Sequence, residues 1–127
     1  MRFLIVDDDR SILALVEEML ANLGHETVSC QDAASACRVD EEIDGYVIDW
    51  HLGSETCESL THHLREQHPH APILMITGDA DLNLIQSALS VGVLDWWFKP
   101  TGMPGLQTQL RGLIANANRP AADQSAA

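Results

Sequence analysis

Short apolar runs alternate with stretches of helical periodicity along most of the chain. The first run, RFLIV at residues 2–6, is too apolar to have a solvent-facing side, and similar runs recur further along. An apolar run of this length is typical of a strand that is buried on both faces of a sheet. The pattern predicts five strands, at residues 2–6, 27–30, 46–50, 72–77 and 94–98.

The segments between these strands repeat apolar residues every three or four positions, which is typical of amphipathic helices. Glycines are expected to end two of the helices, at Gly24 and Gly92, because glycine readily adopts the left-handed conformation found there. Asp32 is expected to cap the second helix, and Pro104 lies in the first turn of the last, where proline is tolerated. The helices are predicted at residues 11–23, 32–42, 55–67, 82–91 and 103–114.

This alternation predicts the fold class. Strands without a polar face that are joined through helices form a parallel sheet covered on both sides. Right-handed crossovers then give a doubly wound α/β fold. In such sheets ligands bind beyond the carboxyl ends of the strands, where the strand order reverses. We therefore expect the chemistry of this chain at those strand ends.

Composition and charge limit the classes of partner. The 127 residues suffice for one domain with a single core. With 19 acidic against 7 basic residues the net charge is −12, which argues against nucleic acid or an anionic membrane as a direct partner. No window reaches the ~18 consecutive apolar residues of a membrane span. The three cysteines form no CxxC pair and no cationic leader is visible, so a cytoplasmic location is expected.

A small set of polar residues follows the predicted strands. Asp7 and Asp8 come after the first strand, and Asp49 directly follows the apolar residues of the third. Thr77 ends the fourth strand, and Lys99 follows the fifth. Lys99 is also the only lysine in the chain. Two like charges ~4 Å apart repel by roughly 4 kcal/mol near a protein surface, so clustered aspartates call for a cation.

Mg²⁺ suits such a cluster, because it prefers oxygen ligands and is commonly held by one or two carboxylates together with a phosphate. An aspartate can also serve as a nucleophile that forms an acyl phosphate. Phosphoryl transfer requires a metal and hydrogen-bond donors around the transferred group. The sequence therefore predicts phosphoryl transfer that uses Mg²⁺, which Mn²⁺ could replace, together with Lys99 and Thr77.

Four fragments in this order and spacing, LIVDDD, VIDW, MIT and FKP, resemble the receiver domain of two-component response regulators. The resemblance extends from residue 2 to about residue 115, and it implies the CheY-like strand order 2-1-3-4-5. It further implies that Asp49 accepts a phosphoryl group from a sensor histidine kinase or a phosphotransfer protein. Asp8 would bind Mg²⁺ directly, Asp7 mainly through water, and the backbone carbonyl of His51 would complete the protein ligands.

The same resemblance implies a switch. Thr77 would turn toward the phosphoryl oxygens, and Trp96 would rotate into the space that it leaves. The face formed by the fourth helix, fifth strand and fifth helix would then change shape for an effector protein, a fused output domain or a second copy of the chain. A cis peptide is expected between Lys99 and Pro100. His51 and Asp79 would tune the lifetime of the phosphorylated state.

Some positions depart from the family pattern. Gly53 stands where a proline is usual, and Cys57 where a glycine is usual, so the loop after Asp49 is expected to have a different shape. Trp96 replaces the commoner Tyr or Phe, which puts the switching step in question more than the phosphorylation. Thr101 replaces a frequent Phe.

Several residues also have a structural interpretation. We expect Asp9 to cap the first helix and Trp97 to pack in the core. The cysteines are interpreted as small buried apolar residues. A purely structural ion network of the strand-end residues is the less favoured interpretation of that cluster. A histidine-rich stretch lacks the spacing of a zinc signature and is interpreted as a solvated helix end; it contains His62, His63, His68 and His70.

The leading hypothesis is a phosphorylation-dependent signalling switch that catalyses its own phosphoryl transfer and dephosphorylation and is not a turnover enzyme. An aspartate-nucleophile phosphatase is an alternative, although such enzymes usually carry a second acid where this chain has His51. A degenerate receiver that acts as a constitutive docking module is another. We expect the receiver domain to span residues 1–117 and residues 118–127 to be a disordered tail or the start of a linker.

Overall fold

The computed structural model describes most of the chain. The described residues are 1–52, 55–56, 58–78, 82–90, 92–93, 95–99 and 102–118.

Five parallel strands form the central sheet, in the order β2-β1-β3-β6-β7. With β6 and β7 as the fourth and fifth predicted strands, this is the expected order 2-1-3-4-5, so the predicted fold class is confirmed. The connection from β2 to β3 passes over β1 and places β3 on the far side of β1, so the strand order reverses between β1 and β3. The strands are β1 (Arg2–Val6), β2 (Glu26–Cys30), β3 (Gly45–Asp49), β6 (Ile73–Thr77) and β7 (Asp95–Phe98).

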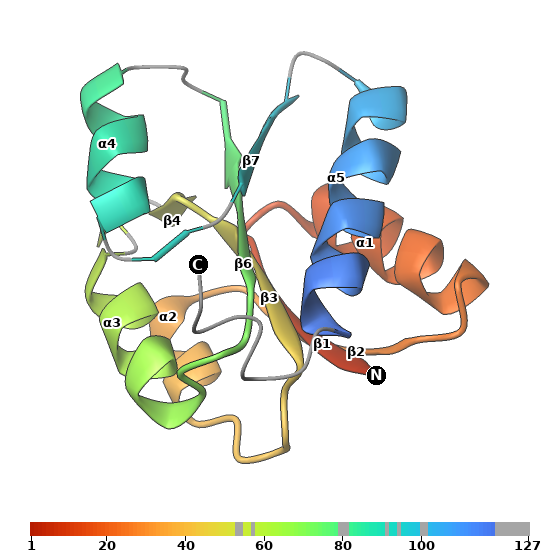
Figure 1. Ribbon diagram of the computed structural model, residues 1–127, viewed down its shortest axis with the longest axis horizontal. Coiled ribbons are helices and arrows are strands. Elements are labelled where there is room, and N and C mark those ends of the chain that lie inside the picture. Colours follow the sequence, from red (N-terminus) through yellow and green to blue (C-terminus); the bar gives the residue numbers. More distant parts are fainter. Residues whose placement is uncertain are drawn as a thin grey trace.

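Helices cover both faces of the sheet (Figure 1). Helices α1 and α5 lie on one face, and α2, α3 and α4 lie on the other. Within the described residues, none of the helices is long and apolar enough to cross a membrane. Their bounds are α1 (Arg10–Asn22), α2 (Ala33–Cys37), α3 (Glu58–Gln67), α4 (Leu82–Ser90) and α5 (Met103–Ala117).

The alternation of side chains along each strand divides the core into two layers. In β1, Phe3 and Ile5 pack with α1 and α5, whereas Leu4 and Val6 pack with the residues of α2, α3 and α4. All four are at most 1% exposed, which explains why this strand has no polar position after Arg2. The predicted core position of Trp97 is confirmed, because it is buried in the layer of α1 and α5.

Local signals set the ends of the helices. The Asp9 side chain accepts the backbone N–H of Ser11 at 2.9 Å and so caps α1, as predicted. Asp32 caps α2 by accepting the backbone N–H of Ser35 at 2.7 Å. Gly24 follows α1 with a φ of +87°, a conformation that glycine adopts without steric cost.

Helix α2 is shorter than the prediction of residues 32–42, since it ends at Cys37. Three consecutive acids follow shortly, from Asp40 to Glu42, and negative charge is unfavourable at the carboxyl end of a helix. Val39 and Ile43, which follow the end of α2, pack against the core from the connection to β3.

A short antiparallel hairpin also replaces the first turn of the third predicted helix. Strand β4 (His51–Leu52) pairs with β5 (Glu55–Thr56), and α3 begins only at Glu58. The two residues between these strands are Gly and Ser in the sequence, types that suit a two-residue hairpin connection.

We expect a Gly45→Ala substitution to destabilise the fold by about 1–3 kcal/mol. An added Cβ would lie 2.8 Å from Cε1 of Phe3, whose ring is fully buried and cannot move without disturbing the layer of α1 and α5. Urea denaturation of both proteins measures the difference. Gly112→Ala in α5 is the matched control, since nothing lies within 4 Å of its added Cβ. It should be neutral or stabilising by up to about 1 kcal/mol.

Candidate functional site

Three aspartates meet at the carboxyl edge of the sheet. Asp7 and Asp8 directly follow β1, and Asp49 is the last residue of β3. The two strands are neighbours, with Val6 paired to Ile48, so their ends lie side by side. One carboxylate oxygen of each aspartate lies within 4.8 Å of the others. The predicted convergence of these three acids is present in the structure.

Asp7 is the most deeply buried of the three acids, with a side chain that is 0% exposed. Its Oδ1 accepts the backbone N–H of Asp9 at 2.9 Å, whereas its Oδ2 has no hydrogen-bond partner. Burial raises the pKa of Asp7 to about 7, and the nearby charge of Asp49 acts in the same direction. The Asp9 N–H and the Lys99 ammonium group partly oppose this rise in pKa.

Lys99 provides the positive charge at the site. It directly follows β7, and its Nζ lies 3.8 Å from Asp7 Oδ2 and 3.7 Å from Asp49 Oδ2. One ammonium group thus stands between two buried carboxylates, while Asp8 adds a third carboxylate at an exposed position. With all groups charged, three carboxylates and one ammonium leave two negative charges, which favours binding of a divalent cation.

The donor set fits Mg²⁺. All three candidate ligands are carboxylates, the hard oxygen donors that this ion prefers, and they form the one three-ligand group found among the described residues. The buried Oδ2 of Asp7 has no hydrogen bond to satisfy it, and a buried unsatisfied carboxylate oxygen is costly. A cation coordinated by these acids would compensate that cost.

Thr77 ends β6, the strand between β3 and β7. It is fully buried and is paired in register with Phe98, one residue before Lys99. On the other side of β6, Ile76 is paired with Asp49. The backbone therefore places Thr77 at the same edge as the acids and the lysine, as the sequence predicts.

Trp96 is half-buried in β7 and packs against the core layer of α2, α3 and α4. The structure therefore places it on the opposite side of the sheet from Trp97. Several other predicted features lie outside the described residues: the side chain of His51, Asp79, the Lys99–Pro100 peptide, Gly53, Cys57, Thr101 and the segment 119–127.

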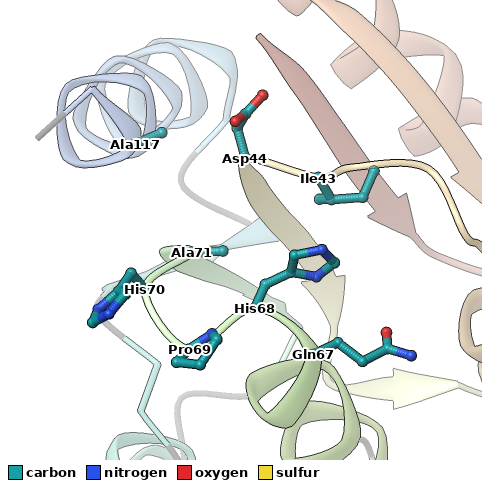
Figure 2. Close-up of a pocket in the computed structure, with 8 residues that line it drawn as sticks. All are labelled: Ile43, Asp44, Gln67, His68, Pro69, His70, Ala71 and Ala117. Atoms are coloured by element: carbon teal, nitrogen blue, oxygen red, sulfur yellow. The ribbon is translucent and has the colours of Figure 1, made fainter. Parts of the chain in front are cut away.

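The histidine-rich stretch lies at the opposite end of the strands. A pocket of about 290 Å³ lies beside the start of β3. Its lining includes His68 and His70 of the α3–β6 region and Asp44 (Figure 2). The Tyr46 hydroxyl and Nδ1 of His68 form a 2.5 Å hydrogen bond. His68 is therefore half-buried with a structural partner, and His63 is half-buried too, so only His62 and His70 are exposed as a solvated helix end requires.

Two contacts at the site were not anticipated from the sequence. The backbone N–H of Asp9 donates to Oδ1 of Asp7 at 2.9 Å. The backbone N–H of Asp7 donates to the Cys30 carbonyl at 3.1 Å. The first has a recognisable signal, because an aspartate commonly accepts the N–H of the residue two positions later. The second depends on the pairing of β1 with β2, which no local pattern reveals.

Comparison with known proteins identifies the same family. The model of the response regulator receiver domain family matches residues 3–111. The response regulator protein PilR of Pseudomonas aeruginosa is 30% identical over 91% of this chain, and the match covers 26% of PilR. The chemotaxis protein CheY of the same organism is 28% identical over 93% of this chain and 99% of CheY. The chain thus spans about a quarter of one relative and nearly all of another.

The receiver domain of the sensor histidine kinase PA1611 from Pseudomonas aeruginosa has a similar structure. The TM-score is 0.75 at 26% identity, over 90% of this chain and 97% of that domain. In that crystal structure a magnesium ion is coordinated in the active site cleft. The sequence match, the shared fold and the acidic strand ends agree, and the chain belongs to the receiver domain family of two-component response regulators.

Proposed function

We propose that this chain is a phosphorylation-dependent switch in which Asp49 accepts a phosphoryl group from a phosphohistidine. The donor would be a sensor histidine kinase or a phosphotransfer protein. The observation that carries the proposal is the position of the Lys99 ammonium group, 3.7 Å from Asp49 and 3.8 Å from Asp7 at the acidic edge. An ammonium group at this distance favours the charged form of a neighbouring carboxylate, which is the form that acts as a nucleophile.

In the transfer step an oxygen of Asp49 attacks the phosphorus. The new P–O bond forms as the bond between phosphorus and the histidine nitrogen breaks, and the imidazole leaves with the electron pair. Lys99 and the Thr77 hydroxyl would donate hydrogen bonds to the phosphoryl oxygens, where negative charge is concentrated. Hydrolysis of the acyl phosphate by water would then return Asp49 to its carboxylate form, with His51 and Asp79 tuning the rate.

Mg²⁺ is the cofactor that this arrangement accommodates, with Mn²⁺ as a substitute. Asp7, Asp8 and Asp49 would hold it together with the backbone carbonyl of His51. When bound, the ion supplies positive charge to the transferring phosphoryl group. Asp8 is the exposed member of the cluster, which makes it the most accessible for direct coordination.

The signal would leave the molecule through the face formed by α4, β7 and α5. This face carries two exposed large apolar side chains, Leu89 on α4 at 47% and Met103 on α5 at 49% exposure. Thr77 and Trp96, on neighbouring strands, would link it to the phosphorylated site. The partner that binds this face would be an effector protein, a fused output domain or a second copy of the chain. This binding would take place in the cytoplasm.

We expect the wild-type chain to take up one phosphoryl group from acetyl phosphate in Mg²⁺, and none when the metal is removed by EDTA. Intact-protein mass spectrometry measures the uptake. Steady turnover of a generic aryl phosphate would instead favour the phosphatase alternative. Equal partner binding with and without a phosphoryl mimic would favour a constitutive docking module.

A further inference from the structure

Arg65 joins three parts of the chain that are far from the acidic site. It lies in α3, and its Nη1 donates to the carbonyls of Pro69 at 3.0 Å and Ala71 at 2.7 Å. Its Nη2 donates to the carbonyl of Gly92 at 2.7 Å. The planar guanidinium group therefore connects the end of α3 and the start of β6 with the turn between α4 and β7.

The turn at Gly92 is shaped to receive this side chain. Gly92 has a φ of +93°, and a Cβ added to it would lie 3.1 Å from both Nε and Nη2 of Arg65. Its backbone N–H donates to the Leu89 carbonyl at 3.2 Å, and the N–H of Val93 donates to the Ala88 carbonyl at 3.2 Å. These bonds close the carboxyl end of α4, so Arg65 holds that end through Gly92.

Helix α4 has a shallow apolar anchorage among its described side chains. Only Ala88 is buried, Ile85 is partly buried, and Leu89 is largely exposed. The link from Arg65 to Gly92 therefore joins this end of α4 and the approach to β7 to the end of α3.

The hydrogen bonds between Arg65 and these carbonyls can also break without leaving an unpaired buried charge on a partner. Arg65 is half-buried, and burial lowers the pKa of its guanidinium group. Among the described residues no carboxylate forms an ion pair with it, and its guanidinium group donates to three neutral carbonyl oxygens. Their hydrogen bonds offset the loss of hydration of the cation and leave only a small surplus. An arrangement with Arg65 in solvent would lose these three hydrogen bonds and regain the hydration of the cation.

We propose that Arg65 is a positioning residue that latches the carboxyl end of α4 and the start of β7 in the resting arrangement, and that this latch opposes the switch. The inference rests on the proposed function, in which loading of Asp49 favours a second arrangement of α4 and β7. The change between the two arrangements and the binding of a phosphoryl group or its mimic at Asp49 are linked equilibria. A contact that stabilises only the resting arrangement must therefore weaken that binding by the factor by which it favours the resting arrangement.

The test measures how tightly Asp49 binds beryllofluoride, which mimics a phosphoryl group, in saturating Mg²⁺. The titration can be followed by indole fluorescence, since the fully buried Trp50 directly follows Asp49. Removal of the latch in Arg65→Met is expected to tighten binding about three- to tenfold, in line with typical coupling free energies. Arg111→Met, the same change at an exposed position of α5, should leave the affinity unchanged.

Tighter binding separates a latch from a merely structural contact, because loss of a structural contact would weaken binding or leave it unchanged. Unchanged or weaker binding by folded Arg65→Met protein would overturn the latch while leaving the proposed function intact. If that variant does not fold, Gly92→Ala and Arg65→Lys replace it, and each is expected to bind more tightly than wild type. Failure of the wild-type chain to bind beryllofluoride would overturn the proposed function and the latch with it.

Discussion

Replacement of Asp49 by asparagine is expected to abolish phosphoryl uptake from acetyl phosphate, with a loss of at least about 100-fold. The amide is uncharged and is a poor nucleophile, so the acyl phosphate cannot form at this position. Asp7 and Asp8 remain in place, and the variant should therefore still bind Mg²⁺, although more weakly. Mass spectrometry of the intact chain measures the first effect and calorimetric titration the second.

The matched control is Asp40→Asn, which removes one negative charge from an exposed acid that does not belong to the strand-end cluster. It should take up phosphoryl groups at the wild-type rate. If Asp49→Asn protein still became phosphorylated while this control behaved normally, another side chain would be the acceptor.

Replacement of Asp7 by asparagine is expected to act on stability and on metal binding in opposite directions. In the metal-free protein at pH 8 the variant should be more stable than wild type, by roughly 2–4 kcal/mol. The reason is the cost of keeping a buried carboxylate ionised beside Asp49. The same substitution removes a buried candidate ligand and should weaken Mg²⁺ binding severely.

The sign of the pH dependence follows from the pKa of Asp7, which is raised from 3.8 to about 7 in the folded chain. Between these two pH values the unfolded chain loses the proton and the folded chain keeps it. This contribution to stability is therefore fully present below about pH 4 and is lost as the pH rises to about 7. Asparagine cannot ionise, so the variant should lack this part of the pH dependence.

Urea denaturation from pH 4 to pH 8, with and without Mg²⁺, measures these effects. Mg²⁺ should raise the stability of the wild type at pH 8, because it binds the folded state, and should do so much less for Asp7→Asn. Asp8→Asn removes a carboxylate from the same cluster at an exposed position, and its stability without metal should change far less. A less stable Asp7→Asn protein at pH 8 would contradict the assigned cost of burial.

The parts of the fold that depend on local pattern could be predicted from the sequence. An apolar strand such as β1 must be buried on both faces, and a polar residue directly after it must lie at the sheet edge. The sequence therefore predicts that Asp7, Asp49 and Lys99 lie together, since the ends of parallel strands share one edge. The caps at Asp9 and Asp32 were equally local.

Other features depend on contacts that no local pattern encodes. The early end of α2 reflects competition between helix periodicity and packing of Ile43 from a connection. The bonds of Arg65 reach carbonyls up to 27 positions away and require the finished arrangement of α3, β6 and the Gly92 turn. The unusual pKa of Asp7 comes from desolvation, which exists only after the chain has folded.

The placement of Lys99 after the last strand has a consequence for synthesis on the ribosome. The acids at the ends of β1 and β3 have been translated when only residues 1–49 exist, but their ammonium partner is added 50 positions later. Until β7 joins the edge of the sheet, a nascent chain carries these carboxylates without their ammonium partner. Under the proposed function, a partly translated chain would therefore be a poor phosphoryl acceptor and would not compete with finished copies for the donor.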